Sequence, residues 1–158
     1  RILDERSIII HDKGESLWTL TAASDFAEGI SGLVGNNEAI GEAFHITSDE
    51  ALSWNQVYRT LGDTLGKEPI VEYIPSEALA RVYPEARGAL FGDKKENGVF
   101  DNTKIKKFVP GFCCRKSFAA AIRESVEWFM QKPVRMAVNP EEDRFIDNLI
   151  QECKKVAI

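Results

Sequence analysis

The sequence is poor in cysteine and has no long apolar run. Its only cysteines are Cys113, Cys114 and Cys153. An odd number of cysteines, two of them adjacent, does not make a disulfide framework, and two ligands at zero spacing fit no standard zinc motif. No stretch approaches the roughly 18 apolar residues that cross a bilayer. We therefore expect reduced thiols, no metal site, no membrane association and a cytoplasmic location.

Positive charge is also in short supply. The chain has 20 Lys and Arg against 25 Asp and Glu, a net charge of −5. Affinity for nucleic acid depends on cations that neutralise phosphates, so this balance makes nucleic acid an unlikely partner. Basic residues gather only in 93–116. That stretch is compatible either with a local anion site or with ordinary solvated surface.

The remaining composition is that of a globular domain, with 44% hydrophobic residues. Short β-branched or alternating runs predict strands at 7–11, 17–21, 42–47 and 70–74, with a stub at 99–100, and the first two would form a hairpin. Capping and periodicity predict helices that start at Ser24, Ser53, Ser76, Ser117 and Pro140. The fold class is therefore α/β, or α+β for this unit alone, with a small mixed sheet and several helices.

Three glycines spell a spacing that can hold a pyrophosphate. Gly29, Gly32 and Gly35 lie within and at the end of the helix from Ser24, however, whereas a phosphate loop follows a strand and opens a helix. We therefore expect Gly29 and Gly32 to be packing residues inside the helix. If that helix face is roomy, Gly32→Ala should be tolerated or mildly stabilising.

No catalytic constellation is present. His11 and His45 fall on expected strands, where a histidine is usually packed and hydrogen-bonded. None of Tyr58, Tyr73 and Tyr83 is followed four residues later by Lys, so the chain has no Tyr-x-x-x-Lys pair. We predict no catalytic and no cofactor-binding residue, and expect this chain alone to be inactive and not to bind NAD(H).

The order of segments nevertheless resembles a known family. The segments are Gly14, Trp18–Thr21, Ser24–Ala27, Gly41–Thr47, Leu52–Trp54, Leu65–Gly66, Asp101–Lys106, Val109–Phe112 and Ile122–Trp128. Over residues 1–132 they look like the C-terminal, substrate-binding part of an NAD-dependent epimerase/dehydratase of the extended short-chain dehydrogenase/reductase family. The start at Arg1, without an initiator Met, fits a piece of a longer chain.

The resemblance implies a division of labour. Residues 1–132 would be the substrate-binding lobe of a Rossmann-type enzyme, and 133–158 would form an amphipathic helix packed on it. A missing N-terminal half would hold NAD or NADP and the catalytic pair. The helix from Ser24 and the strand 43–46 would dock on that half, so the isolated lobe is expected to self-associate, for example as a homodimer. The substrate would be a small sugar-like or otherwise hydroxylated molecule.

Trp18, Arg87, Asp93 and Lys94 are the expected substrate-binding residues. Many family members carry, at the position of Trp18, an Arg that binds the substrate diphosphate through its forked donors. Trp18 cannot do this, and Ala22 replaces a usual His or Tyr. Both departures argue against a nucleotide-diphosphate sugar. The alternative function is a non-catalytic module that reuses the lobe to bind RNA or protein.

Overall fold

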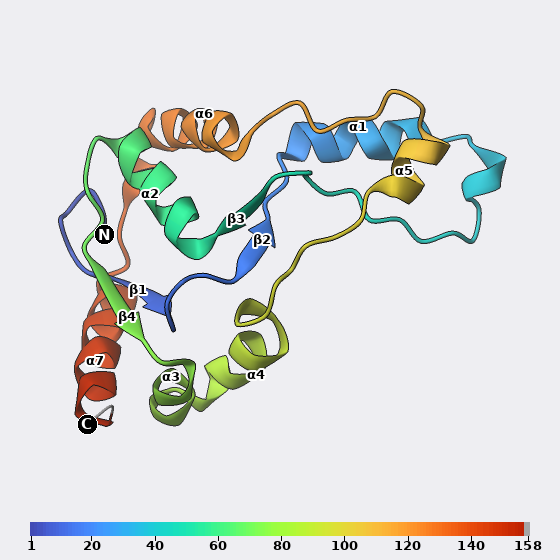
Figure 1. The fold of residues 1–158 in the computed structure, drawn as a ribbon. Helices are drawn as coiled ribbons and strands as arrows, with labels where there is room; N and C mark the ends of the chain where they lie inside the picture. Colours follow the sequence, from blue (N-terminus) through green and yellow to red (C-terminus); the bar gives the residue numbers. More distant parts are fainter. Residues whose placement is uncertain (157–158) are drawn as a thin grey trace.

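Two separate two-stranded ladders organise the fold (Figure 1). The computed structural model describes residues 1–156. Strand β1 (Ile8–His11) pairs in parallel with β4 (Val71–Ile74), and β2 (Leu17–Thr19) pairs antiparallel with β3 (Ala51–Ser53). Parallel and antiparallel pairings thus both occur, and the α/β class is confirmed.

Helices surround these ladders. The α-helices are α1 (Ala23–Leu33), α2 (Trp54–Leu65), α3 (Ser76–Val82), α4 (Arg87–Ala89), α5 (Thr103–Phe108), α6 (Phe118–Met130) and α7 (Pro140–Val156). The short turns are η1 (Asn37–Ala39), η2 (Pro84–Ala86), the π-helical η3 (Leu90–Lys94) and η4 (Pro133–Met136). No helix within residues 1–156 is long and apolar enough to cross a membrane.

Two of the strand expectations are wrong. The segments 7–11 and 17–21 do not form a hairpin, because β1 takes β4 as its partner. This pairing lets Ile74 join the apolar cluster beneath α3 and α7. Residues 42–47 form no strand either. Their backbone binds a side chain, since Asn102 Oδ1 accepts a hydrogen bond from the Thr47 amide at 3.1 Å and Asn102 Nδ2 donates to the Thr47 carbonyl.

Several helix boundaries in the structure lie where the capping residues in the sequence predict them. Ser53 and Gln56 form both hydrogen bonds of a capping box at the start of α2, and Gly66 ends that helix with a left-handed φ of 66°. Ser117 caps α6 through the Ala120 amide. Helix α1 begins one residue before Ser24, without a side-chain cap. Side-chain capping thus accounts for the starts of α2 and α6 and not for that of α1.

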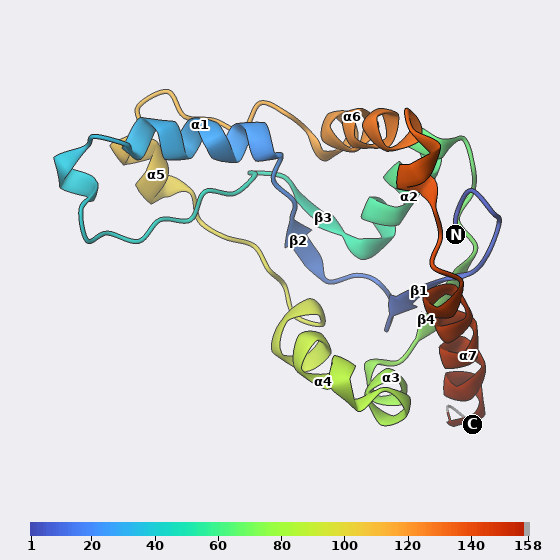
Figure 2. The same cartoon turned by 180° about the vertical axis from the view of Figure 1, so that it is seen from behind.

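The two apolar cores lie far apart along the molecule (Figures 1 and 2). One packs α3 and α7 against β4, with Ile74, Ala78, Leu79, Leu90, Ile150 and Cys153 buried together. The other lies in an arm made of α1 and α5, where Ile46, Ile105 and Phe112 are buried. Ile46 is therefore covered by helices of this chain, and no missing partner is needed for it.

Gly29 and Gly32 have negative φ angles and pack closely, as expected for helix-interior glycines. A Cβ on Gly29 would lie 2.5 Å from Ile46 Cγ2. One on Gly32 would overlap the Val109 side chain. The face of α1 that carries Gly32 is therefore not roomy, so the condition for the expected tolerance of Gly32→Ala is not met.

Candidate functional site

The carboxyl ends of β1 and β4 meet at one edge of the parallel ladder, where ligands commonly bind in open α/β sheets. Asp12 follows β1 and Ser76 follows β4 after one proline. Asp12 Oδ1 accepts a hydrogen bond from the Ser76 amide at 2.9 Å, and Asp12 Oδ2 accepts one from the Ser76 hydroxyl at 2.6 Å. These bonds hold the two strand ends together.

The turn after β1 has an unusual backbone. Asp12 has a φ of 51°, which is uncommon for a residue with a side chain, and Gly14 has a φ of 67°. A Cβ at Gly14 would lie 2.5 Å from Asn55 Oδ1, so this position requires glycine in both conformation and space. Residues 11–16 and Lys95 line a pocket of about 320 Å³. We call it the strand-end pocket.

Charged groups at the strand-end pocket hold one another in place. Burial alone would raise the pKa of Asp12, but the hydrogen bonds from Ser76, together with the nearby charges of Lys95 and His11, hold this pKa below its ordinary value of 3.8. Lys95 Nζ donates to Glu77 Oε1 at 3.0 Å. That hydrogen bond raises the pKa of Lys95 and lowers that of Glu77. The pocket is thus lined by groups that stay ionised at neutral pH.

A row of aromatic side chains runs beside the strand-end pocket. The ring centroids of His11 and Trp54 are 6.0 Å apart, and those of Trp54 and Trp18 are also 6.0 Å apart. Lys94 Nζ lies 4.0 Å from the centroid of Trp18, within cation–π range. The row therefore joins β1, β2, α2 and η3 into one wall.

This wall contains polar atoms without partners. Both ring nitrogens of His11 and Nε1 of Trp54 are buried and make no hydrogen bond. His11 Nδ1 lies 3.6 Å from Oδ2 of the neighbouring Asp12, beyond normal hydrogen-bond length. His11 is thus packed, as the sequence suggested, but it is not hydrogen-bonded. Unpaired buried polar atoms are rare and often mark a functional site or an ordered water.

Trp18 anchors the segment that closes this side of the site. Its Nε1 donates to the Glu96 carbonyl at 3.2 Å, and Ser16 Oγ donates to the Lys94 carbonyl at 2.8 Å. A Cβ on Gly98 would lie 3.0 Å from the indole. Gly98 covers one part of the Trp18 ring and Lys94 covers another. The ring therefore packs against the segment 94–98 and is not an open surface on which a ligand could stack.

The structure brings together three of the four expected substrate-binding residues. Trp18 and Lys94 are in contact, and Lys94 Nζ also pairs with Asp93 Oδ2 at 2.8 Å. Arg87 lies on α4, where its guanidinium carbon is 5.0 Å from the centre of the Phe91 ring. None of the four lines the strand-end pocket, whose wall is formed by residues 11–16 and Lys95.

Sequence reasoning missed Asp12, Ser76 and Lys95. Asp12 and Ser76 each follow an expected strand closely, and this is the signal that was available. Using it requires the knowledge that the two strands are parallel neighbours, since only then do their carboxyl ends lie at one edge. The expected hairpin concealed this relation.

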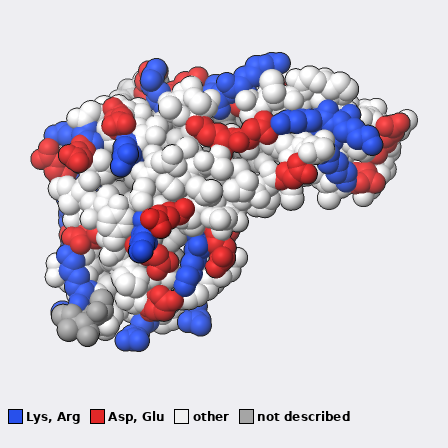
Figure 3. Space-filling model, viewed as in Figure 1, with Lys and Arg blue, Asp and Glu red and all other residues white. Residues whose placement is uncertain are grey.

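Six of the seven cations in the basic stretch 93–116 pair with carboxylates. Figure 3 shows basic and acidic side chains interspersed on the face in view. Lys104 pairs with Glu42, Lys106 with Asp49, Arg115 with Glu28 and Lys116 with Glu124, as Lys94 and Lys95 do with Asp93 and Glu77. Cations that already have carboxylate partners attract phosphates poorly. The arrangement therefore gives the RNA-binding alternative no support.

The residues present do not fit a dinucleotide. The spaces beside Gly29 and Gly32 are filled by Ile46 and Val109, so no backbone cradle is open there. The parallel ladder has two strands, and within residues 1–156 none of its strands leads through a glycine loop into a helix. The described part of the chain also holds no group of three His, Cys, Asp or Glu side chains suited to a metal ion.

The fold is similar to that of part of several sugar-nucleotide epimerases and dehydratases. One similar structure is dTDP-glucose 4,6-dehydratase from Bacillus anthracis in complex with NAD, with a TM-score of 0.62 and 16% identity over 84% of this chain and 37% of that one. Another is UDP-glucose 4-epimerase from Thermotoga maritima with UDP-glucose. Its TM-score is 0.60, and its identity is 21% over 83% of this chain and 37% of that one.

A third is UDP-glucuronic acid 4-epimerase from Bacillus cereus in complex with NAD, with a TM-score of 0.61 and 15% identity over 80% of this chain and 34% of that one. The chain thus spans about a third of the length of these enzymes. No protein-family model and no curated protein sequence matches it. The comparison therefore establishes a shared fold over most of this chain.

Proposed function

We propose that this chain is the substrate-binding part of an NAD(P)-dependent epimerase, dehydratase or reductase that acts on a sugar-like or otherwise hydroxylated molecule. The observation that carries the proposal is the strand-end pocket with its polar lining, in a chain whose fold matches a third of sugar-nucleotide enzymes. Carboxylates, ammonium groups and a serine hydroxyl are the side-chain groups that this pocket offers to substrate hydroxyls.

In this proposal the chain binds and orients, and it performs no bond-making step. Lys95 and the backbone of the turn 12–16 would contact substrate hydroxyls, while the row of Trp18, Trp54 and His11 would exclude water from one side. Holding a substrate in one orientation is a large part of enzymatic rate enhancement. The cofactor and the proton-transfer residues would belong to another polypeptide segment.

The proposed seat of that segment is the outer face of α1. Phe26 and Ile30 on this helix and Val34, the residue that ends it, are spaced four residues apart and are 47%, 41% and 77% exposed. An apolar helical stripe of this kind normally packs against another layer of structure. About two thirds of each matched enzyme has no counterpart in this chain. A nucleotide-binding half would therefore be a suitable partner for this face of α1.

Tryptophan fluorescence tests substrate binding, because two of the three tryptophans belong to the site. We expect UDP-glucose, dTDP-glucose or free glucose to change the emission of the chain with saturation. Trp18→Phe should remove most of the change, and Trp128→Phe, whose residue lies on α6, should preserve it. Loss of the response in Trp128→Phe instead, or no response to any of the three ligands, would refute the proposal.

Calorimetry with NADH and NADPH tests the division of labour. We expect no binding heat from the 158-residue chain, since no dinucleotide cradle is open in the described residues. Micromolar binding of either nucleotide would contradict the assignment of the cofactor to another segment.

A further inference from the structure

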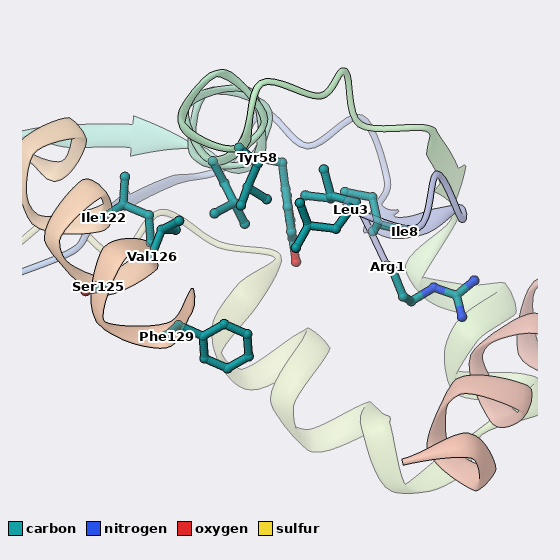
Figure 4. A pocket seen from close by; sticks show the side chains of 11 residues that line it. Arg1, Leu3, Ile8, Tyr58, Ile122, Ser125, Val126 and Phe129 are labelled. Carbon is teal, nitrogen blue, oxygen red and sulfur yellow. The ribbon is translucent and has the colours of Figure 1, made fainter. Parts of the chain in front are cut away.

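A second cavity, of about 430 Å³, lies away from the strand-end pocket, between α2, α6 and the residues that precede β1 (Figure 4). Its wall is aliphatic and aromatic, with Leu61 and Leu65 from α2 and Ile122, Val126 and Phe129 from α6. Its volume falls in the range of about 300–1,000 Å³ that is typical of small-molecule sites. Nothing in the proposed function uses this cavity.

One polar group points into the cavity. The Tyr58 ring extends from α2, and its hydroxyl lies between Val126 on one side and Leu3 and Ile8 on the other (Figure 4). Among the described residues this hydroxyl has no hydrogen-bond partner, whereas Tyr73 Oη donates to Asn55. Burial raises the pKa of Tyr58, so the phenol stays protonated and can donate.

The other polar side chains of the wall, Arg1 and Ser125, already have partners. The Arg1 guanidinium points away from the cavity, toward Asp143 and Asp147, with which it pairs. Ser125 Oγ donates to the Ala121 carbonyl at 3.0 Å. A charged ligand would therefore lose its hydration without gaining a partner.

We propose that this cavity binds an uncharged, mainly apolar small molecule that accepts one hydrogen bond from Tyr58. The apolar wall gives the ligand its main gain through burial, and the single phenol donor orients it. This chemistry differs from that of the strand-end pocket, which suits hydroxylated or ionic groups. The two sites therefore take different classes of ligand, and the second does not depend on the proposed function.

A matched pair of probes tests the proposal. Cyclohexanone and methylenecyclohexane have nearly the same shape, and only the ketone accepts a hydrogen bond. In an NMR titration of the full chain we expect both to shift the methyl signals of Leu61, Leu65, Ile122 and Val126. We expect the ketone to bind about threefold to tenfold more tightly, which corresponds to one neutral hydrogen bond. Tyr58→Phe should abolish that preference and retain binding of the hydrocarbon.

Cavity-filling variants provide the second arm. Val126→Trp should eliminate binding of both probes, and Leu65→Trp should do the same if the first variant folds poorly. Val99→Trp, at an exposed position outside the cavity, is the matched control and should retain both affinities. The proposal fails if neither probe shifts these methyls or if filled variants still bind. It also fails if Tyr58→Phe keeps the ketone preference, or if dilution shows that a second copy of the chain occupies the cavity.

Discussion

Gly32 sets the distance at which α1 can cross the end of α5. Its missing side chain leaves room for Val109, the residue that follows α5 and packs on Ile105 and Phe112. A methyl group at this position would have to displace a branched side chain that belongs to the core of the arm. Interiors tolerate such insertion poorly, because neighbouring side chains are already close-packed.

We therefore predict that Gly32→Ala destabilises the chain by about 1–3 kcal/mol, the usual cost of overpacking, in urea unfolding. Gly88→Ala is the matched control. A Cβ there meets nothing within 4 Å, so the helical preference of alanine should stabilise slightly or leave the midpoint unchanged. A wild-type midpoint for Gly32→Ala would show that Val109 moves aside freely.

Asp12 has a strained backbone conformation and a fully hydrogen-bonded carboxylate. Its left-handed backbone costs free energy, and its two carboxylate oxygens recover stability by accepting both hydrogen bonds from Ser76. Because the pKa is lowered in the folded state, this contribution is fully present above the ordinary value of 3.8. It is lost as the pH falls through the lower folded-state value.

The expected result for Asp12→Asn is a loss of about 1–3 kcal/mol at pH 7, measured by urea unfolding. The difference from wild type should shrink as the pH falls below the ordinary carboxyl range, since protonation weakens the same bonds in the wild-type chain. Asp4→Asn, at an exposed residue, should follow the wild-type pH profile. A constant difference at all pH values would mean that ionisation of Asp12 contributes nothing.

At the scale of elements, helix α7 is fixed by apolar contacts at one end and by ion pairs at the other. Ile150 and Cys153 enter the core with α3 and β4. Near the start of the helix, Arg1 and Arg6 each pair with both Asp143 and Asp147, which are one turn apart. The N-terminal segment and α7 are thereby held together as one unit.

Burial predicts that the two aspartates contribute unequally. The Asp143 side chain is 9% exposed and that of Asp147 is 44% exposed. Asp143→Asn should cost about 1.5–3 kcal/mol in thermal or urea unfolding, as expected for charge-assisted hydrogen bonds that are shielded from water. Asp147→Asn should cost less, and added salt should reduce its effect further. Equal losses would show that exposure does not determine the strength of this network.

The sequence predicted helices better than strand pairing, for a physical reason. A capping box or a terminal glycine acts within four residues, as at Ser53, Gln56 and Gly66, and so can be read locally. The pairing of β1 with β4 joins residues about 60 positions apart, and nothing local distinguishes it from a hairpin with β2. The strand-end pocket depends on that pairing, which brings Asp12 and Ser76 together. Trp18 and Lys94 are proposed from the family resemblance, which needs no knowledge of strand pairing.

At the scale of the whole molecule, the arm that carries α1 extends away from the part that holds both ladders (Figures 1 and 2). The inner side of the arm buries Ile46, Ile105 and Phe112, and its outer side exposes the stripe of Phe26, Ile30 and Val34. Helix α7 does not cover this stripe, since it packs on α3, β1 and β4. The expected exposed face is thus reduced to α1, because the segment 43–46 forms no strand.

We predict that, without a complementary partner, the chain self-associates through this stripe. Apolar residues repeated every four positions on one helix form a seam that a second copy can match, and contiguous exposed apolar surface favours such contacts. Light scattering and sedimentation at tens of micromolar should show a dimer. Ile30→Lys should yield a monomer with unchanged helix content, because a charge at the centre of the seam cannot be buried without a partner. Val134→Lys, at a residue of η4 that is 78% exposed, should leave the dimer intact. A wild-type monomer, or equal dissociation by both substitutions, would exclude α1 as the contact.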